Sequence, residues 1–445
     1  MNKIYKVKGK SITNKIRRWT AVKNENLFSR IKDWVDSIPL VDIHSHIDGE
    51  HPNAKDARQI IFYHYIVTEL TSAGIPPKTI SPDLPIEETV KGAIPYLALI
   101  RNTSTYWYFT RMLRELYGFE EGEINEKNYE SLLEAIQARK GQRDWYRQVL
   151  TKKAKVKKTF LTFNYDADIP KHDPQLFVGA LRLDPLIGKL DKSSIAGLER
   201  AVGTSIRSAS DFEDSLALLF KKFSKCVAAT ASFLPDEVFT RPSKAEAEEP
   251  FRKLLSGLAL SASEKQTVSS LALNCILSLA EEHGLPFQVM LGVWRPIQGA
   301  SPPDYAISGF EPKMLTSLCP LFHDFSGVKF DIFLANRVTS HELTVVAKNY
   351  PNVHVSGYWW YAFYPTIIKE FLRERLQMLP RNKINGFFSD AYVVEWSYAK
   401  ASMVRLQIAT VLTEMVEEGY YTEELARELA VDLLTHNPEK LYRLT

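Results

Sequence analysis

The stretch Val41-Asp42-Ile43-His44-Ser45-His46 decides how the rest of the chain is interpreted. It is a short apolar segment that ends in two histidines separated by one residue. Side chains at positions i and i+2 of a β-strand point to the same face, so both imidazoles project together. Neutral imidazole binds zinc and similar divalent cations, and burying two imidazoles without partners costs free energy. We therefore expect a metal site here, with two hydrogen-bonded core histidines as the alternative.

Composition narrows the range of functions. The 445-residue chain has 24% charged residues and a net charge of only +3, which gives no strong field toward nucleic acid or a membrane surface. No apolar stretch approaches the roughly 18 residues of a membrane span, and the first residues lack the apolar core of a signal peptide. Three scattered cysteines, at 226, 275 and 319, argue for a reducing compartment. We expect a cytoplasmic protein without nucleic-acid or membrane partners.

Eight short apolar runs alternate with helical patterns along the chain. Most of the runs are nearly continuous in apolar residues, as parallel strands covered on both faces require. Strand and helix alternating eight times is typical of an α/β protein with a (β/α)8 TIM barrel. The predicted strands are residues 41–46, 156–163, 177–183, 226–232, 287–293, 327–330, 352–355 and 384–389.

One connection is too long for a barrel loop. Residues 52–155 show apolar positions at helical spacing, which predicts a helical insertion after the first strand, over the mouth of the barrel. Residues 1–40 are expected to form an N-terminal helical segment whose basic run suits a solvated or frayed end, and residues 41–445 the barrel domain. The helical patterns include residues 57–72, 87–99, 106–116, 129–139, 211–222 and 263–283, while 243–250 suits a surface loop or a helix start.

The barrel prediction brings a third group to the histidines. Asp390 follows the eighth predicted strand, which in a closed barrel lies beside the first, on the face where such barrels build their sites. Three protein ligands with positions left for water or substrate are typical of a catalytic metal. We expect one divalent ion at His44, His46 and Asp390, zinc first, with manganese, iron and nickel also compatible. A helix N-cap is the alternative role for Asp390.

The HxH motif and the aspartate after strand eight resemble the amidohydrolase superfamily. Further motifs resemble one branch of it, the uronate isomerase family, and they follow in family order from about residue 38 to the C-terminus. These motifs are His64-Tyr65 followed by Ser72-Ala73-Gly74, then Ala180-Leu181-Arg182-Leu183-Asp184-Pro185, Gly357-Tyr358-Trp359-Trp360 and Ser389-Asp390-Ala391.

The resemblance implies an intramolecular oxidoreductase of carbohydrate metabolism that interconverts the aldose and ketose forms of a hexuronate such as glucuronate or galacturonate. An arginine can grip the carboxylate of the sugar acid with two hydrogen bonds, and a divalent metal can polarise the aldehyde and hydroxyl at its other end. A base must move the C2 proton to C1 through an enediol, and Asp390 or an ionised Tyr65 could do so; we favour Asp390. The residues implied to hold the sugar acid are His64, Tyr65, Arg182 and Trp359 or Trp360.

Three positions depart from the family pattern. Family members typically have an arginine two residues after the strand-eight aspartate, where this chain has Tyr392, which removes a positive charge from the pocket. Many members have a histidine on strand five, where this chain has the poor metal ligand Met290; Arg295, beyond that strand, could partly replace the missing charge. The fourth predicted strand ends without the lysine that bridges two metals in other amidohydrolases. We therefore expect a single metal.

Other interpretations stay open from the sequence. The same ligands could serve a single-metal hydrolase or lactonase that uses a metal-activated water, or a binding protein without chemistry. Arg182 could merely pair with Asp184. His64 and Tyr65 could be ordinary helix packing, and the tryptophans ordinary core. The substrate's identity is in doubt, and the oligomeric state is undetermined, a homo-oligomer included.

Overall fold

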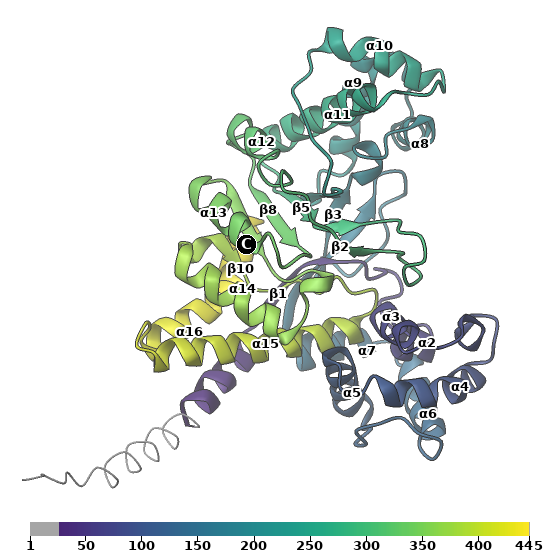
Figure 1. Cartoon of the computed structure of the whole chain (residues 1–445), viewed down its shortest axis with the longest axis vertical. Coiled ribbons are helices and arrows are strands. Elements are labelled where there is room, and N and C mark those ends of the chain that lie inside the picture. Colours follow the sequence, from purple (N-terminus) through teal and green to yellow (C-terminus); the bar gives the residue numbers. More distant parts are fainter. Residues whose placement is uncertain (1–25, 445) are drawn as a thin grey trace, which may run out of the picture.

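Eight parallel strands form the central sheet of the computed structural model, which describes residues 26–444 (Figure 1). Their order follows the chain, and the α/β TIM-barrel prediction is confirmed. A small antiparallel pair, β6 (Val293–Trp294) and β7 (Ile307–Ser308), follows β5. The barrel strands are β1 (Leu40–Ser45), β2 (Val156–Asn164), β3 (Phe177–Arg182), β4 (Ala228–Ser232), β5 (Phe287–Leu291), β8 (Phe330–Leu334), β9 (Val353–Ser356) and β10 (Ile384–Asn385).

Barrel closure depends on the segment after β10 rather than on β10 itself. The amide of Asp390 donates to the carbonyl of His44 at 2.9 Å, and the amide of His46 donates to the carbonyl of Ala391 at 2.8 Å. The buried carboxylate of Asp42 accepts from the Ser389 amide at 2.7 Å. These bonds hold residues 389–391 beside β1.

Six predicted strands agree with the structure to within two residues at each end, and two differ by more. The sixth was expected at residues 327–330, but β8 begins at Phe330 and continues to Leu334, because the buried Asp331 interrupts the apolar run that it belongs to. The eighth was expected at 384–389, but regular pairing ends at Asn385. There the chain leaves the sheet, and the Gly386 amide donates to the carbonyl of Leu433.

Residues 52–155 contain a group of helices that lies to one side of the barrel (Figure 1). The helix expected over 57–72 is two helices, because the chain turns at Phe62 and Tyr63, where the Tyr63 ring stacks on Trp396 at 4.3 Å. The grouping of this insertion with residues 41–445 as one domain stays a prediction. The helices are α2 (Ala57–Ile61), α3 (His64–Ser72), η1 (Pro77–Ile80), α4 (Ile86–Leu99), α5 (Ser104–Tyr117), α6 (Tyr129–Lys140), α7 (Trp145–Arg147) and the π-helical η2 (Gln148–Lys153).

Helices also follow most of the later strands, and α8 to α11 gather at one end of the molecule (Figure 1). The charged stretch at 243–250 begins α10, whose first turn is capped reciprocally by Ser243 and Glu246. The helices are η3 (Asp184–Leu186), α8 (Lys192–Val202), α9 (Ala209–Lys222), α10 (Lys244–Leu255), α11 (Ala262–Glu282), α12 (Cys319–Asp324), α13 (Ser340–Asn349), η4 (Trp360–Ala362), α14 (Pro365–Met378), η5 (Arg381–Lys383), α15 (Val394–Glu417), α16 (Glu423–Val431), the π-helical η6 (Asp432–His436) and α17 (Asn437–Leu441).

The predicted N-terminal segment is described only in part. Residues 26–37 are helical, and the basic run from Lys3 to Arg18 lies outside the described residues. Within residues 26–444, none of the helices combines the length and the apolar character that crossing a bilayer requires.

Side chains fill the interior of the barrel, so it is a packed core and not a pore. Segments far apart in the sequence contribute, because Val41 and Ile43 of β1 pack there with Leu441 and Tyr442 of the C-terminal segment. Above this layer, at the carboxyl ends of the strands, polar groups replace apolar ones.

Candidate active site

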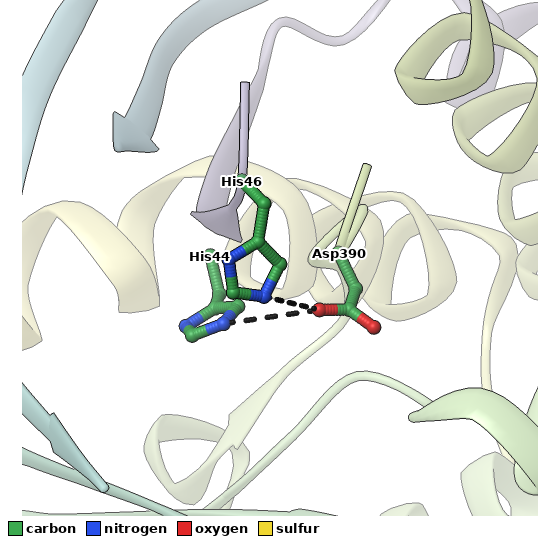
Figure 2. A group of neighbouring side chains, drawn as sticks. All are labelled: His44, His46 and Asp390. Atoms are coloured by element: carbon green, nitrogen blue, oxygen red, sulfur yellow. Dashed lines mark ion pairs between the residues drawn. The ribbon is translucent and has the colours of Figure 1, made fainter. Parts of the chain in front are cut away.

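Three potential metal ligands converge at the carboxyl end of the barrel (Figure 2). His44 and His46 project from the end of β1, and Asp390 reaches them from the segment after β10. The Nε2 atom of His46 lies 3.2 Å from Oδ1 of Asp390, and Nε2 of His44 lies 3.8 Å from the same oxygen. One ligand atom from each residue falls within 4.8 Å of the others. This is the juxtaposition that the sequence predicts.

The environment of His44 fits a cation. Its Nε2 atom is buried and has no hydrogen-bond partner among the described residues, a costly state unless another group satisfies the lone pair. Burial, followed by the nearby charge of His46, lowers the pKa of His44 to about 4, so the imidazole is neutral near pH 7, as a metal ligand must be. Two imidazoles and a carboxylate are ligands that suit zinc, manganese, iron and nickel alike, so the ligand types do not identify the metal.

Asp390 is held in a strained and heavily supported conformation. Its backbone φ of +50° lies in the left-handed region, which a residue with a side chain rarely adopts. Its carbonyl accepts from the Tyr63 hydroxyl at 3.2 Å and from Nζ of Lys400 at 3.5 Å. Burial opposes ionisation, but the hydrogen bond from His46 and the charges of His46 and Lys400 outweigh it and hold the pKa of Asp390 well below its usual range. The carboxylate is therefore ionised at neutral pH.

A cavity opens at these ligands. It brings together all of the sequence-predicted site residues except Tyr65. Its lining comprises His44, His46, His64, Thr162, Arg182, Asp184, Thr230, Ser232, Met290, Arg295, Asp304, Trp359, Trp360, Asp390 and Tyr392.

Among the described residues, Tyr65 lines a separate, smaller pocket instead of this cavity. Its ring packs under the ammonium of Lys400, 4.3 Å away. Burial, reinforced by the negative charge of Asp390, raises the pKa of Tyr65 well above its usual value, which disfavours an ionised Tyr65 as the base. His64 does line the cavity, and burial followed by the charge of Lys400 lowers its pKa to about 3, so its imidazole is neutral.

Arg182 pairs with Asp184, the alternative that the sequence left open. Its Nε donates to Oδ2 of Asp184 at 2.6 Å, and Oδ1 of Asp184 accepts from the Ser232 amide. The pair still lines the cavity, so Asp184 fixes the guanidinium beside it. Arg295 reaches the same wall, where it donates to the Ser232 hydroxyl at 3.2 Å. Two guanidinium groups therefore face the cavity.

Tyr392 occupies the place where the family pattern has an arginine. Its ring stacks on His46, with centroids 5.0 Å apart and planes 21° apart, and it is 48% exposed. A second, larger cavity adjoins this position and shares His64, Asp304 and Tyr392 with the first.

The two tryptophans take different positions. Trp359 is buried and donates from Nε1 to Oδ2 of Asp390 at 3.1 Å. Trp360 is only partly buried and stacks on Tyr361 with centroids 5.1 Å apart. The structure therefore distinguishes two residues that the sequence motif leaves equivalent.

Sequence reasoning missed three residues near the site: Lys400, Asp304 and Gln288. Lys400 is buried within α15, where burial lowers its pKa to about 8; a lysine within a largely apolar helix was the available signal. Asp304 lies in the loop between β6 and β7, without a motif around it. Gln288 was read as part of an apolar strand, yet it contacts His44.

Fold and site together define a (β/α)8 TIM barrel with a candidate His-His-Asp metal centre at the carboxyl ends of its strands. No family model matches the chain. It is 23% identical to a uronate isomerase of Phenylobacterium zucineum (strain HLK1), over 94% of this chain and 93% of that protein. The chain is a divergent relative of the uronate isomerases, which confirms the resemblance in its motifs.

Two solved structures share the fold. Uronate isomerase from Thermotoga maritima superposes with a TM-score of 0.87 at 17% identity, covering 94% of this chain and 97% of that one. Glucuronate isomerase from Caulobacter crescentus gives a TM-score of 0.84 at 19% identity, covering 95% of this chain and 94% of that one. The whole architecture, the helical insertion included, therefore has counterparts in these proteins.

Proposed function

We propose that this protein is a metal-assisted aldose-ketose isomerase that acts on a hexuronate such as glucuronate or galacturonate. The observation that carries the proposal is one cavity lined by three potential metal ligands and two arginines. A sugar acid has matching chemistry, with a carboxylate at one end and an aldehyde and hydroxyl at the other. The uronate isomerase relatives support an enzyme of the isomerase class.

His44, His46 and Asp390 would hold one divalent ion, with zinc as our first candidate. When bound, such an ion supplies a Lewis acid for the carbonyl and hydroxyl oxygens of the sugar. Arg182 would bind the carboxylate of the substrate, because Asp184 already fixes its guanidinium through Nε. Arg295 and the Tyr392 hydroxyl would contribute where the family arginine is absent.

The isomerisation requires no oxidant. Asp390 removes the proton from C2 while the carbonyl oxygen on C1 gains a proton, which gives an enediol. The proton then passes to C1 as the C2 hydroxyl loses its own, which gives the ketose. The neutral imidazole of His64, which lines the cavity, would exchange a proton with the hydroxyl groups.

A direct assay tests this proposal. The purified protein, freed of metal and reloaded separately with Zn²⁺, Mn²⁺, Fe²⁺ or Ni²⁺, is incubated with D-glucuronate and D-galacturonate, and ketose formation is followed by NMR. D390N serves as the inactive control. Ketose formation that D390N abolishes supports the proposal; tight sugar-acid binding without turnover under every metal contradicts it and points to a binding protein.

A single-metal hydrolase or lactonase is the second candidate. The observation that favours it is Tyr392 in place of an arginine, beside a large adjoining cavity, which suits a less acidic and larger substrate. The same ligands would activate a water, and Asp390 would accept its proton. R182M should still hydrolyse a neutral ester or lactone, whereas it should lose turnover of a hexuronate.

A further inference from the structure

The C-terminal segment enters the barrel from the end opposite the candidate site. Tyr442 follows α17 and is 2% exposed, with its ring edge-on to Phe160 at a centroid distance of 4.9 Å. Its hydroxyl contacts the carboxylate of Asp331 and, at 3.0 Å, the side-chain amide of Gln288. A residue three positions before the last residue of this sequence therefore reaches the strand-five side chain that touches His44.

The chemistry of these groups fixes the direction of each hydrogen bond. The amide nitrogen of Gln288 can only donate, so the Tyr442 hydroxyl accepts from it and gives its own proton to Asp331. Burial, with the charge of Asp331 next, raises the pKa of Tyr442 well above its usual value, so the phenol keeps this proton. Asp331 is further held by the Ser356 hydroxyl and, at 3.4 Å, by the Asn385 amide.

The orientation of Gln288 follows from its other partner. Nε2 also donates to the carbonyl of Ile43 at 2.8 Å, and this carbonyl can only accept. The opposite amide orientation would put two acceptors in contact there. Oε1 of Gln288 must therefore face Nδ1 of His44, which lies 3.1 Å away.

An amide oxygen can only accept, so Nδ1 of His44 carries the hydrogen and Nε2 carries the free lone pair. Nε2 is buried, has no hydrogen-bond partner within residues 26–444, and faces Asp390. The Nδ1–H tautomer is the form in which this imidazole can ligate a metal through Nε2.

We propose that Gln288 and Tyr442 are positioning residues that set the tautomer and ring orientation of His44, so that the C-terminal segment controls metal affinity from the far end of the barrel. The affinity part rests on the proposed metal-assisted function. The tautomer part concerns the metal-free protein and stands or falls independently.

The test uses the full chain and two readouts. Zn²⁺ affinity is measured by competition with a chelator for the parent, Y442F, Q288M and the control Y421F, which loses a comparable hydrogen bond to the Leu376 carbonyl in another part of the fold. The His44 tautomer is read from ¹⁵N shifts of histidine-labelled, metal-free protein, with H44N used for assignment. Urea unfolding of each metal-free variant distinguishes a general loss of stability from a specific loss of Zn²⁺ affinity.

We expect the Nδ1–H tautomer at His44 in the parent and a mixed population in Q288M. Removing groups that orient a metal-bound histidine typically weakens binding about 10–100-fold, so we expect roughly a tenfold loss of Zn²⁺ affinity in Y442F, a larger loss in Q288M and none in Y421F. An Nε2–H tautomer in the parent, or parental Zn²⁺ affinity in both folded variants, overturns the inference. If Q288M fails to fold, Y442F alone decides the affinity part. A parent that binds no Zn²⁺, Mn²⁺, Fe²⁺ or Ni²⁺ refutes the proposed function, while the tautomer measurement still decides the positioning of His44.

Discussion

The indole nitrogen of Trp359 donates to Oδ2 of Asp390 at 3.1 Å, while Oδ1 of the same carboxylate faces the two histidines. The two oxygens therefore have separate partners. One is oriented by a neutral donor from the segment after β9, and the other is free to ligate a cation together with β1. Asp390 can therefore ligate a cation through Oδ1 while the hydrogen bond from Trp359 to Oδ2 sets the orientation of the carboxylate.

This division predicts different effects for two neighbouring tryptophans. W359F removes a hydrogen bond to a charged group, worth about 1.5–3 kcal/mol, and should lower kcat for hexuronate isomerisation roughly 10–100-fold. W360F removes no bond to Asp390 and should act mainly on KM. Steady-state kinetics of both variants check this prediction. Equal kcat losses in the two would contradict the assigned division.

Removing the guanidinium of Arg182 should be severe for a sugar acid. R182M loses charge-assisted hydrogen bonds to the substrate carboxylate worth about 3 kcal/mol, so kcat/KM for hexuronates should fall roughly 100-fold or more. The control is R337M, which removes the guanidinium of an exposed arginine. Unchanged turnover of hexuronates by R182M would be incompatible with carboxylate binding at this arginine.

Metal binding should be measurable as stability. A ligand present at 100 times its Kd that binds only the folded state raises the free energy of unfolding by about 2.7 kcal/mol. We expect Zn²⁺ or Mn²⁺ to raise the Tm of the parent and of H51N, whose side chain is exposed, but not that of H46N. Differential scanning calorimetry of chelator-treated protein supplies the measurement. An equal rise in H46N would place the ion elsewhere.

Restoring the family arginine should improve the use of sugar acids. Tyr392 is 48% exposed on the cavity wall, so a longer side chain can be accommodated there. Y392R should lower KM for glucuronate or galacturonate roughly tenfold, since a hydrogen bond to a charged group is worth about 1.5–3 kcal/mol. The ratio of kcat/KM for an acidic to a neutral substrate is the measurement. A fall in that ratio would indicate that the natural substrate lacks a carboxylate at this position.

A buried glutamate gives the protein a predictable pH dependence. Glu395 accepts from Nε1 of Trp145 at 3.0 Å, and burial raises its pKa from 4.5 to about 7. The folded state therefore binds more protons than the unfolded state between these values, so its stability contribution falls as pH rises from about 4.5 to 7. E395Q should remove this loss. Between pH 5 and pH 8, the free energy of unfolding of the parent should fall by up to about 3 kcal/mol more than that of E395Q.

Urea unfolding of metal-free protein at both pH values checks this dependence. The exposed Glu424 provides the control E424Q, which should follow the parent. An unchanged slope in E395Q would show that another group is responsible.

Much of the fold was predictable because the pattern of residue types over short stretches indicates strands and helices. The VDIHSH run, the apolar parallel strands and the capped helices each follow from periodicity over a few residues. The errors came where local signals conflict with tertiary contacts. Asp331 interrupts the β8 pattern because its partners, among them Tyr442, are distant in sequence. Tyr63 breaks an otherwise continuous helical pattern to stack on Trp396.

The candidate site divides in the same way. His44, His46 and Asp390 follow from strand spacing and barrel closure, whereas the support for Asp390 does not. Lys400 and Tyr63 reach its carbonyl from a following helix and from the turn between α2 and α3, and no spacing rule brings them there. That Tyr65 does not line this cavity likewise depends on a tertiary contact, the packing of its ring against Lys400 of α15.

The sequence by itself determined the parallel barrel, the histidine pair on one strand face and the family resemblance, since these depend on periodicity and on motifs in order. Only the tertiary structure decided which tryptophan touches Asp390, that Arg182 is fixed by Asp184, and that a tyrosine from the C-terminal segment reaches the amide beside His44. The physical reason is that each of these hydrogen bonds depends on where the folded chain places both side chains. The partners range from two residues apart, for Arg182 and Asp184, to 154 residues apart, for Gln288 and Tyr442, and local pattern does not fix those positions.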